Sequence, residues 1–208
     1  DFFIEIFAGT AGLSTHVKAL GKVIYTFDTK TGRSGDILNK DTYQLIRDLI
    51  GSKHCIGVWF GMPCGTLSRA RRNDGGPGPL RDPDHVMKPH AKCTPSEKTR
   101  VLMANRILER MIAIIDHCIN NKKPWYIENP RDSRLWDTSV IQSLEQRSGA
   151  TKSRWDYCQF GTEYMKPTTI LAWHNDEFVA NSRTCGFGSH NEWKLSLIHI
   201  SEPTRREG

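Results

Sequence analysis

Residues 2–12, which read FFIEIFAGTAG, decide the fold class. The run 2–7 is apolar and rich in strand formers, with Glu5 as its only charge, so we expect a buried strand. The small residues that follow predict a tight turn, and a helix is expected over 13–20, up to Gly21. A second strand is expected next, ending at Asp28. The order strand, turn, helix, strand is typical of an α/β sheet.

The rest of the chain repeats this alternation. Further strands are expected over 55–60, 125–127 and 168–173, and further helices over 41–50, 94–119 and 138–146. The longest helix opens with Thr94-Pro95-Ser96-Glu97, a capping box with proline at the first helical position. Polar residues gather just after strand ends. The sequence therefore predicts a doubly wound, mostly parallel α/β sheet that binds ligands at the carboxyl ends of its strands.

Composition excludes several classes of protein. The chain has 208 residues, 38% of them apolar, and a formal net charge of +6. No apolar run approaches the roughly 18 residues of a membrane span, and the apolar content argues against disorder. The six cysteines form no CxxC pair, which favours a reducing compartment. We therefore expect an intracellular protein, cytoplasmic or nuclear, that is monomeric and makes no membrane contact.

The last residues have an unusual pattern. Residues 195–205 read LSLIHISEPTR, which resembles a translated sequencing adapter. We expect the native sequence to end near Lys194, so that 1–194 is a catalytic domain truncated at both ends and 195–208 is a non-native tail. The alternative is a natural amphipathic tail.

The opening turn and Asp28 together suggest a nucleotide-type pocket. Small residues let the backbone approach a ligand, and a helix amino end offers free N–H groups. An acid at the end of the second strand can accept ribose hydroxyls. A third glycine in the GxGxxG register and a Walker lysine are both absent, which weakens NAD and ATP as ligands. The alternative is a tight strand-to-helix connection. The candidate residues of the turn are Phe7, Ala8, Gly9, Thr10 and Gly12.

A cysteine follows the third predicted strand. Pro63-Cys64 opens a stretch, 65–93, that has no periodicity and is rich in Gly, Pro, Arg and Asp. Most cysteines are inert packing residues, and we expect that of Cys55 and Cys118. Cys64 differs because arginines follow it, and nearby cations lower the pKa of a thiol and create a nucleophile.

An acid follows another predicted strand. Glu128 comes after Trp125-Tyr126-Ile127 and before Asn129-Pro130. A carboxyl group beside an aromatic strand suits proton transfer. The alternative is a structural acid that caps the turn, with Asn129 holding the backbone.

These motifs, taken together, resemble the cytosine-C5 DNA methyltransferases. Glu5-Ile6-Phe7-Ala8-Gly9 looks like the opening motif of that family, Gly61-Met62-Pro63-Cys64 like its catalytic Pro-Cys, and Glu128-Asn129 like its Glu-Asn. Asp28 matches the ribose-binding acid, and Asp36-Ile37 looks like the adenine-contacting pair. The resemblance covers about residues 3–130. It implies a Rossmann-like fold of the S-adenosylmethionine-dependent methyltransferase type, with that molecule as cofactor.

The resemblance also implies a mechanism. Cys64, presented by Pro63, would add to C6 of a flipped cytosine in DNA, so that C5 can take the methyl group. Glu128 would protonate or hydrogen-bond N3, and Asn129 would hold the loop. Two departures keep alternatives open: Gly65 stands where the family has Gln, and the late Gln-x-Arg-x-Arg motif is replaced by residues 160–168, with Lys166. The alternatives are the same chemistry on RNA, or an inactive relative that binds nucleic acid.

The charge is concentrated in one region. Residues 66–110 hold ten Lys or Arg against five Asp or Glu, a net +5 of the total +6. A basic loop beside the nucleophile could clamp a phosphate backbone, whereas the alternative is solvated surface charge. The predicted nucleic-acid contacts are Ser68, Arg69, Arg71, Arg72 and Lys166, with Arg81, Lys88 and Lys92 in or beside the same loop.

Cys158, Cys185 and His190 form a weak candidate metal site, with Asp156 or Cys93 as a fourth ligand. Zinc suits such ligands, but the spacing matches no finger pattern. The spacing favours separate structural residues, so no metal is predicted.

Overall fold

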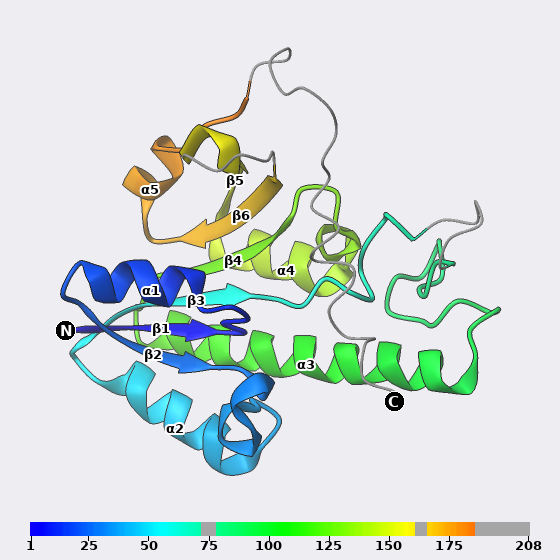
Figure 1. The fold of residues 1–208 in the computed structure, drawn as a ribbon, viewed down its shortest axis with the longest axis horizontal. Helices are drawn as coiled ribbons and strands as arrows, with labels where there is room; N and C mark the ends of the chain where they lie inside the picture. Colours follow the sequence, from blue (N-terminus) through cyan, green and yellow to red (C-terminus); the bar gives the residue numbers. More distant parts are fainter. Residues whose placement is uncertain (72–77, 161–165, 186–208) are drawn as a thin grey trace.

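The computed structural model describes residues 1–71, 78–160 and 166–185 of the chain (Figure 1). Six strands form one sheet in the order β2-β1-β3-β4-β6-β5. The predicted α/β sheet is confirmed: it is Rossmann-like, with β1, β2, β3 and β4 mutually parallel. The strands are β1 (Phe2–Ile6), β2 (Val23–Phe27), β3 (Cys55–Gly61), β4 (Trp125–Pro130), β5 (Thr151–Asp156) and β6 (Pro167–Trp173).

Helices cover both faces of this sheet. The α-helices are α1 (Gly12–Ala19), α2 (Lys40–Gly51), α3 (Pro95–Asn120), α4 (Ser139–Ser148) and α5 (Asp176–Ala180). Short 3₁₀ turns occupy Thr29–Thr31, Arg33–Gly35, Arg134–Asp137 and Tyr157–Phe160. In Figure 1, α2 and α3 lie below the sheet, and α1 and α5 lie above it.

Strand alternation divides the buried side chains between these two faces. Ile4 and Ile6 of β1 enter the large core that α2, α3 and α4 cover. Glu5, between them, points to the opposite face and meets Ser14 of α1. A smaller aromatic cluster on that face centres on Tyr126 and Trp155 and includes Phe178 of α5. The parallel strands therefore place their carboxyl ends along one edge, between these two layers.

The antiparallel part of the sheet was not predicted. β6 lies between β4 and β5 and is antiparallel to both. Its pairing extends β4 through Pro130, so Glu128 and Asn129 are paired residues within the strand. Both residues were expected in a turn after the strand. The predicted strand 125–127 was therefore too short, and β5 and α5 were missed.

Local capping signals are confirmed. Thr94 accepts from the Glu97 N–H, and the Glu97 carboxylate accepts from the Thr94 N–H at 2.9 Å, so the capping box begins α3 where the sequence places it. The predicted helix 138–146 is also present as α4, with Thr138 as its N-cap. Among the described residues, no helix is both long and apolar enough to cross a bilayer.

The described parts of the stretch 65–93, residues 65–71 and 78–93, are held by more contacts than their composition suggests. Arg81 is 1% exposed and forms an isolated bridge with Pro89. Its guanidinium donates to the Thr66 carbonyl at 3.1 Å, the Val86 carbonyl at 2.8 Å and the Asn105 amide oxygen at 2.8 Å. Arg81 was expected to be a basic residue of a mobile loop. It is a buried anchor that joins this stretch to α3.

Candidate active site

The turn after β1 has an unusual backbone. Phe7, Gly9 and Ala11 all have positive φ, at 64°, 56° and 57°. Such angles are strained for residues with a Cβ, and Gly9 is the one position where they cost little. The Ala11 N–H donates to the Ala8 carbonyl at 2.7 Å, which closes the turn and begins α1. A Cβ built at Gly12 meets no atom within 4 Å, so there is open space beside Gly12 at the helix start.

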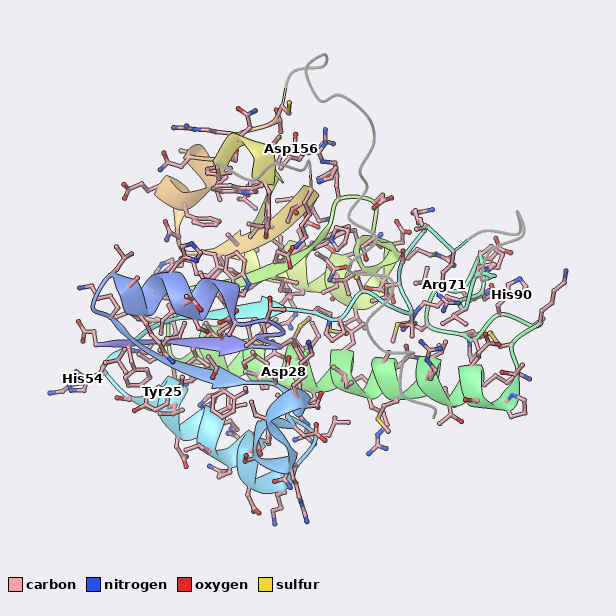
Figure 2. All side chains as sticks on the ribbon, viewed as in Figure 1. Tyr25, Asp28, His54, Arg71, His90 and Asp156 are labelled. Atoms are coloured by element: carbon pink, nitrogen blue, oxygen red, sulfur yellow. The ribbon has the colours of Figure 1, made fainter. Side chains whose placement is uncertain are left out.

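Asp28 lies directly beside this turn, at the end of β2 (Figure 2). One carboxylate oxygen accepts from the Gly9 N–H at 2.9 Å, and the other accepts from the Lys30 N–H at 2.8 Å. A carboxylate has about four lone-pair positions, so each oxygen keeps capacity for a ligand hydroxyl. The structure therefore brings the predicted turn and the predicted acid together.

The Asp36-Ile37 pair closes the same region. Gly35 packs so tightly that a Cβ there would lie 2.0 Å from the Asp28 carbonyl oxygen, which explains the glycine. The Asp36 carboxylate accepts from the Leu38 N–H at 2.9 Å, and Ile37 is buried in the core. The segment that follows the two 3₁₀ turns is thus held against the end of β2.

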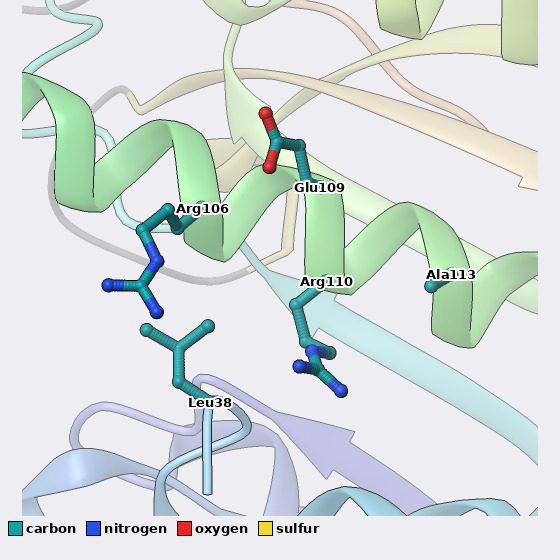
Figure 3. Close-up of a pocket in the computed structure, with 5 residues that line it drawn as sticks. All are labelled: Leu38, Arg106, Glu109, Arg110 and Ala113. Carbon is teal, nitrogen blue, oxygen red and sulfur yellow. The ribbon is translucent and has the colours of Figure 1, made fainter.

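A surface hollow adjoins this segment on the α3 side. It is lined by Leu38, Arg106, Glu109, Arg110 and Ala113 (Figure 3). The guanidinium groups of Arg106 and Arg110 extend toward Leu38, whereas the Glu109 carboxylate extends to the opposite side of the helix. Arg110 also stacks 4.1 Å above the Tyr43 ring. The hollow lies beside the predicted adenine-contacting pair and was not foreseen from sequence.

Pro63-Cys64 follows β3 and is tied to β4 by one buried amide. The Asn129 side chain is fully buried and donates to the Met62 carbonyl at 2.6 Å. β3 and β4 are in register at Gly61 and Glu128, so the residues that follow β3 begin level with the acid. Pro63 is exposed and Cys64 is half-buried. The Asn129 bond fixes the backbone immediately before both of them.

The Glu128 carboxylate belongs to a cluster of three side chains. Lys166, which precedes β6, donates to Glu128 Oε1 at 3.1 Å, with the two side chains 18% and 13% exposed. The Tyr157 hydroxyl donates to the same oxygen at 3.5 Å. The Lys166 ammonium also lies 4.6 Å from the centre of the Tyr157 ring, a cation–π contact.

The electrostatics of Cys64 differ from the sequence-based expectation. Burial and the nearby Glu128 carboxylate raise the pKa of the Cys64 thiol above its ordinary value of 9.0, and Asp132 adds to this. Lys166 is the cation that acts in the other direction. The arginines that follow Cys64 were expected to lower its pKa, and this was wrong: the pKa is raised, and of these arginines Arg69 pairs with Asp137 and Arg71 donates to the Gly78 carbonyl.

The structure places the predicted nucleic-acid contacts in several different environments. Arg69 forms an ion pair with Asp137 yet stays 52% exposed. Arg71 donates to the Gly78 carbonyl at 3.1 Å, and burial together with Arg100 lowers its pKa. Ser68 accepts from the Ala70 N–H, and Lys166 is paired with Glu128. Arg72 lies outside the described residues. Nucleic-acid binding by this set stays a prediction.

The candidate metal ligands are only partly brought together. The Cys185 thiol hydrogen-bonds to Cys158, but His190 lies outside the described residues, as do all of 195–208. Asp156 is buried and occupied by Arg131 at 2.5 Å and by the Cys185 N–H at 2.7 Å. Cys93 is buried and donates to the Leu80 carbonyl. Within the described ranges, no group of three or more His, Cys, Asp or Glu is placed to hold a metal.

Sequence reasoning missed Tyr157 and the role of Glu5. Glu5 is buried beneath the start of α1, where its carboxylate accepts from both the N–H and the hydroxyl of Ser14. Burial raises the pKa of Glu5, although the Ser14 bonds oppose this. A charge inside an otherwise apolar strand was the available signal for Glu5. Tyr157 carried no comparable signal, because its contacts depend on the unpredicted pairing of β5 with β6.

Comparisons with known proteins add a similarity to solved structures. No protein-family model and no curated protein matches the chain. Among solved structures, the chain is similar to the crystal structure of S. pombe Dnmt2 methyltransferase, with a TM-score of 0.45 and 14% sequence identity. The aligned region covers 89% of this chain and 56% of that chain. The chain thus spans about half the length of that neighbour.

Proposed function

We propose that this chain transfers a methyl group to C5 of cytosine in DNA, with Cys64 as the nucleophile and Glu128 as the acid. One observation carries the proposal: the Asn129 amide joins the backbone before Pro63-Cys64 to the strand that presents Glu128. A nucleophile and an acid are thereby held at adjacent parallel strand ends, where α/β sheets bind their ligands.

Each residue has a defined chemical task. The Cys64 thiolate adds to C6 of the base, and the electron pair displaced from the ring is accommodated at N3, where Glu128 donates a proton or hydrogen bond. C5 thereby becomes nucleophilic enough to attack a methyl donor. Loss of the C5 proton to solvent water, departure of the Cys64 sulfur as thiolate and return of the N3 proton to Glu128 then restore the ring. The base must leave the duplex stack for these atoms to meet.

The residues beside β1 and β2 fit S-adenosylmethionine. Asp28 keeps acceptor capacity on both oxygens for ribose hydroxyls, and there is open space beside Gly12 at the helix start. Asp36 is half-buried beside this region, and Ile37 next to it is buried in the core, so Ile37 would support the adenine-contacting segment from beneath. When bound, this molecule would supply an electrophilic methyl group on a sulfonium. The protein's own part is to hold it beside C5 of the target base.

Trapping tests this proposal. The chain, incubated with S-adenosylmethionine and random-sequence DNA that carries 5-fluorocytosine, should form a covalent adduct that survives denaturation. C5 of this base carries fluorine in place of hydrogen, so no proton can leave to release the Cys64 sulfur. Cys64→Ser should abolish the adduct, whereas Cys55→Ser, at a buried core position, should retain it. An adduct on the matching RNA and not on DNA would assign the chemistry to RNA. DNA binding without any adduct would contradict the enzymatic proposal and favour an inactive relative.

A further inference from the structure

The carboxyl group of Glu128 is held asymmetrically. Both of its side-chain partners, Lys166 and Tyr157, contact Oε1. No hydrogen bond joins Oε2 to any residue within 1–71, 78–160 or 166–185. A carboxylate fixed through one oxygen keeps its second oxygen oriented and available, which suits a group that must meet a substrate atom.

The two partners also support each other. The Lys166 ammonium hydrogen-bonds to the Tyr157 hydroxyl and stacks on the Tyr157 ring at 4.6 Å. Burial works against the charge on Lys166, but the Glu128 carboxylate and Tyr157 outweigh it and raise the pKa of Lys166. Burial and Glu128 likewise raise the pKa of Tyr157 to about 12, so its hydroxyl keeps its proton at neutral pH. Lys166 and Tyr157 thus both keep the protons with which they bind Glu128.

The cluster joins parts of the chain that are distant in sequence. Glu128 is on β4, Tyr157 follows β5 and Lys166 precedes β6. The antiparallel pairing of β6 with both β4 and β5 therefore delivers both partners to the acid.

We propose that Tyr157 and Lys166 are positioning residues that hold Glu128 Oε1, so that Oε2 faces the base bound at Cys64. This inference rests on the proposed function. Neither residue contacts the reacting atoms. Tyr157 acts through its hydroxyl and its ring, and Lys166 acts through its charge.

Variants separate these contributions. Tyr157→Phe keeps the ring and removes the hydroxyl, and we expect adduct formation to slow about tenfold, as for one lost hydrogen bond to a charged group. Lys166→Met removes the charge, and we expect a loss of about 100-fold. Lys166→Arg should recover most of that loss. The matched controls are Tyr126→Phe, whose hydroxyl instead accepts from Asn175, and Lys152→Met, whose ammonium pairs with Glu145. Both controls should stay within about twofold of the parent rate.

A pH profile distinguishes positioning from simple loss of structure. The charged groups that act on Cys64 are Glu128 and Asp132, which raise its pKa, and Lys166, which lowers it. The rate of adduct formation should rise with pH as the thiolate forms. In Lys166→Met that rise should move to higher pH, whereas in Tyr157→Phe the rate should fall without a comparable move. Equal losses with an unmoved profile in both variants would overturn the inference.

A second measurement does not depend on activity. Trace acylation, read by mass spectrometry between pH 8 and 11, reports how readily each lysine loses its proton. Glu128→Gln should make Lys166 react at lower pH, while Lys152 should not change. If the pH dependence of Lys166 acylation does not change, Lys166 is not paired with Glu128, and the inference is overturned. If Lys166 responds but the parent protein forms no adduct on DNA or RNA, the proposed function is refuted and the positioning role is refuted with it.

Discussion

Asp28 and Glu128 lie at the carboxyl ends of two parallel strands of the same sheet, β2 and β4, but different kinds of group hold their carboxylates. Backbone N–H groups of Gly9 and Lys30 hold both oxygens of Asp28. Side chains from the antiparallel part of the sheet hold one oxygen of Glu128. Backbone donors stay in place whatever the side chains are, whereas a side-chain clamp disappears with a single substitution.

This contrast separates binding from chemistry. A carboxylate with spare lone pairs on both oxygens suits a ligand that stays bound and presents two hydroxyls. A carboxylate held at one oxygen suits a proton or hydrogen bond exchanged at the other. We therefore expect substitutions at the two acids to change different kinetic quantities.

The largest expected effect comes from the two acids themselves. Glu128→Gln should lower the rate of adduct formation about 10²- to 10³-fold at saturating S-adenosylmethionine, because a proton donor is lost. Asp28→Asn should weaken S-adenosylmethionine binding about tenfold and leave the saturated rate nearly unchanged. Calorimetric titration gives the binding constant and trapping gives the rate. The contrast is broken if both variants change the same quantity.

A similar contrast among the cations should appear in stability. Arg81 is buried and held by the Thr66 and Val86 carbonyls and Asn105, whereas Arg147 forms a surface ion pair with Asp116. Arg81→Met should lower the free energy of unfolding by about 2–4 kcal/mol, because buried acceptors lose their donor. Arg147→Met should cost less than about 1 kcal/mol. Urea unfolding curves measure both, and equal costs would contradict the assigned anchor role.

Asn129 tests the link between the nucleophile and the acid. Asn129→Ala leaves the buried Met62 carbonyl without its donor, so we expect about 1–3 kcal/mol of destabilisation and slower adduct formation. Asn181→Ala is the control, since its exposed amide donates only to a helical carbonyl. Thermal melts and trapping of both variants give the comparison. If Asn129→Ala is as stable as the parent and forms the adduct at the same rate, the Asn129–Met62 hydrogen bond no longer supports the proposed function.

The smallest expected effect has the opposite sign. Glu128 raises the pKa of Cys64, so Glu128→Gln should lower that pKa and increase the thiolate fraction at pH 8. Alkylation of Cys64 by iodoacetamide should then be about threefold to tenfold faster, even though methyl transfer is slower. Asp28→Asn should leave alkylation unchanged. Peptide mass spectrometry assigns the label to Cys64. Slower alkylation in Glu128→Gln would contradict the conclusion that Glu128 raises the pKa of Cys64.

Local patterns predicted much of this molecule. The first strand, its turn and Asp28 could be placed because their signals lie within a few residues of each other, as do those of the capping box at Thr94. The prediction for Arg81 was wrong because the sequence does not distinguish a buried arginine from a surface one. Its hydrogen-bond acceptors come from three separate segments. Tyr157 and Lys166 acquire their contacts from the long-range pairing of β6, which periodicity does not encode.

The place of β6 also sets an order of assembly. Among the described strands β5 pairs with β6 alone, yet β5 is synthesised first, so its partner is absent until β6 is made. Likewise, Glu128 is synthesised before its partner Lys166, which is 38 residues further along the chain. At elongation rates of about 5–20 residues per second, the wait lasts seconds. During synthesis, a nascent chain therefore carries Cys64 and Glu128 before it carries the strand that completes their surroundings, and only the finished domain holds all three parts together.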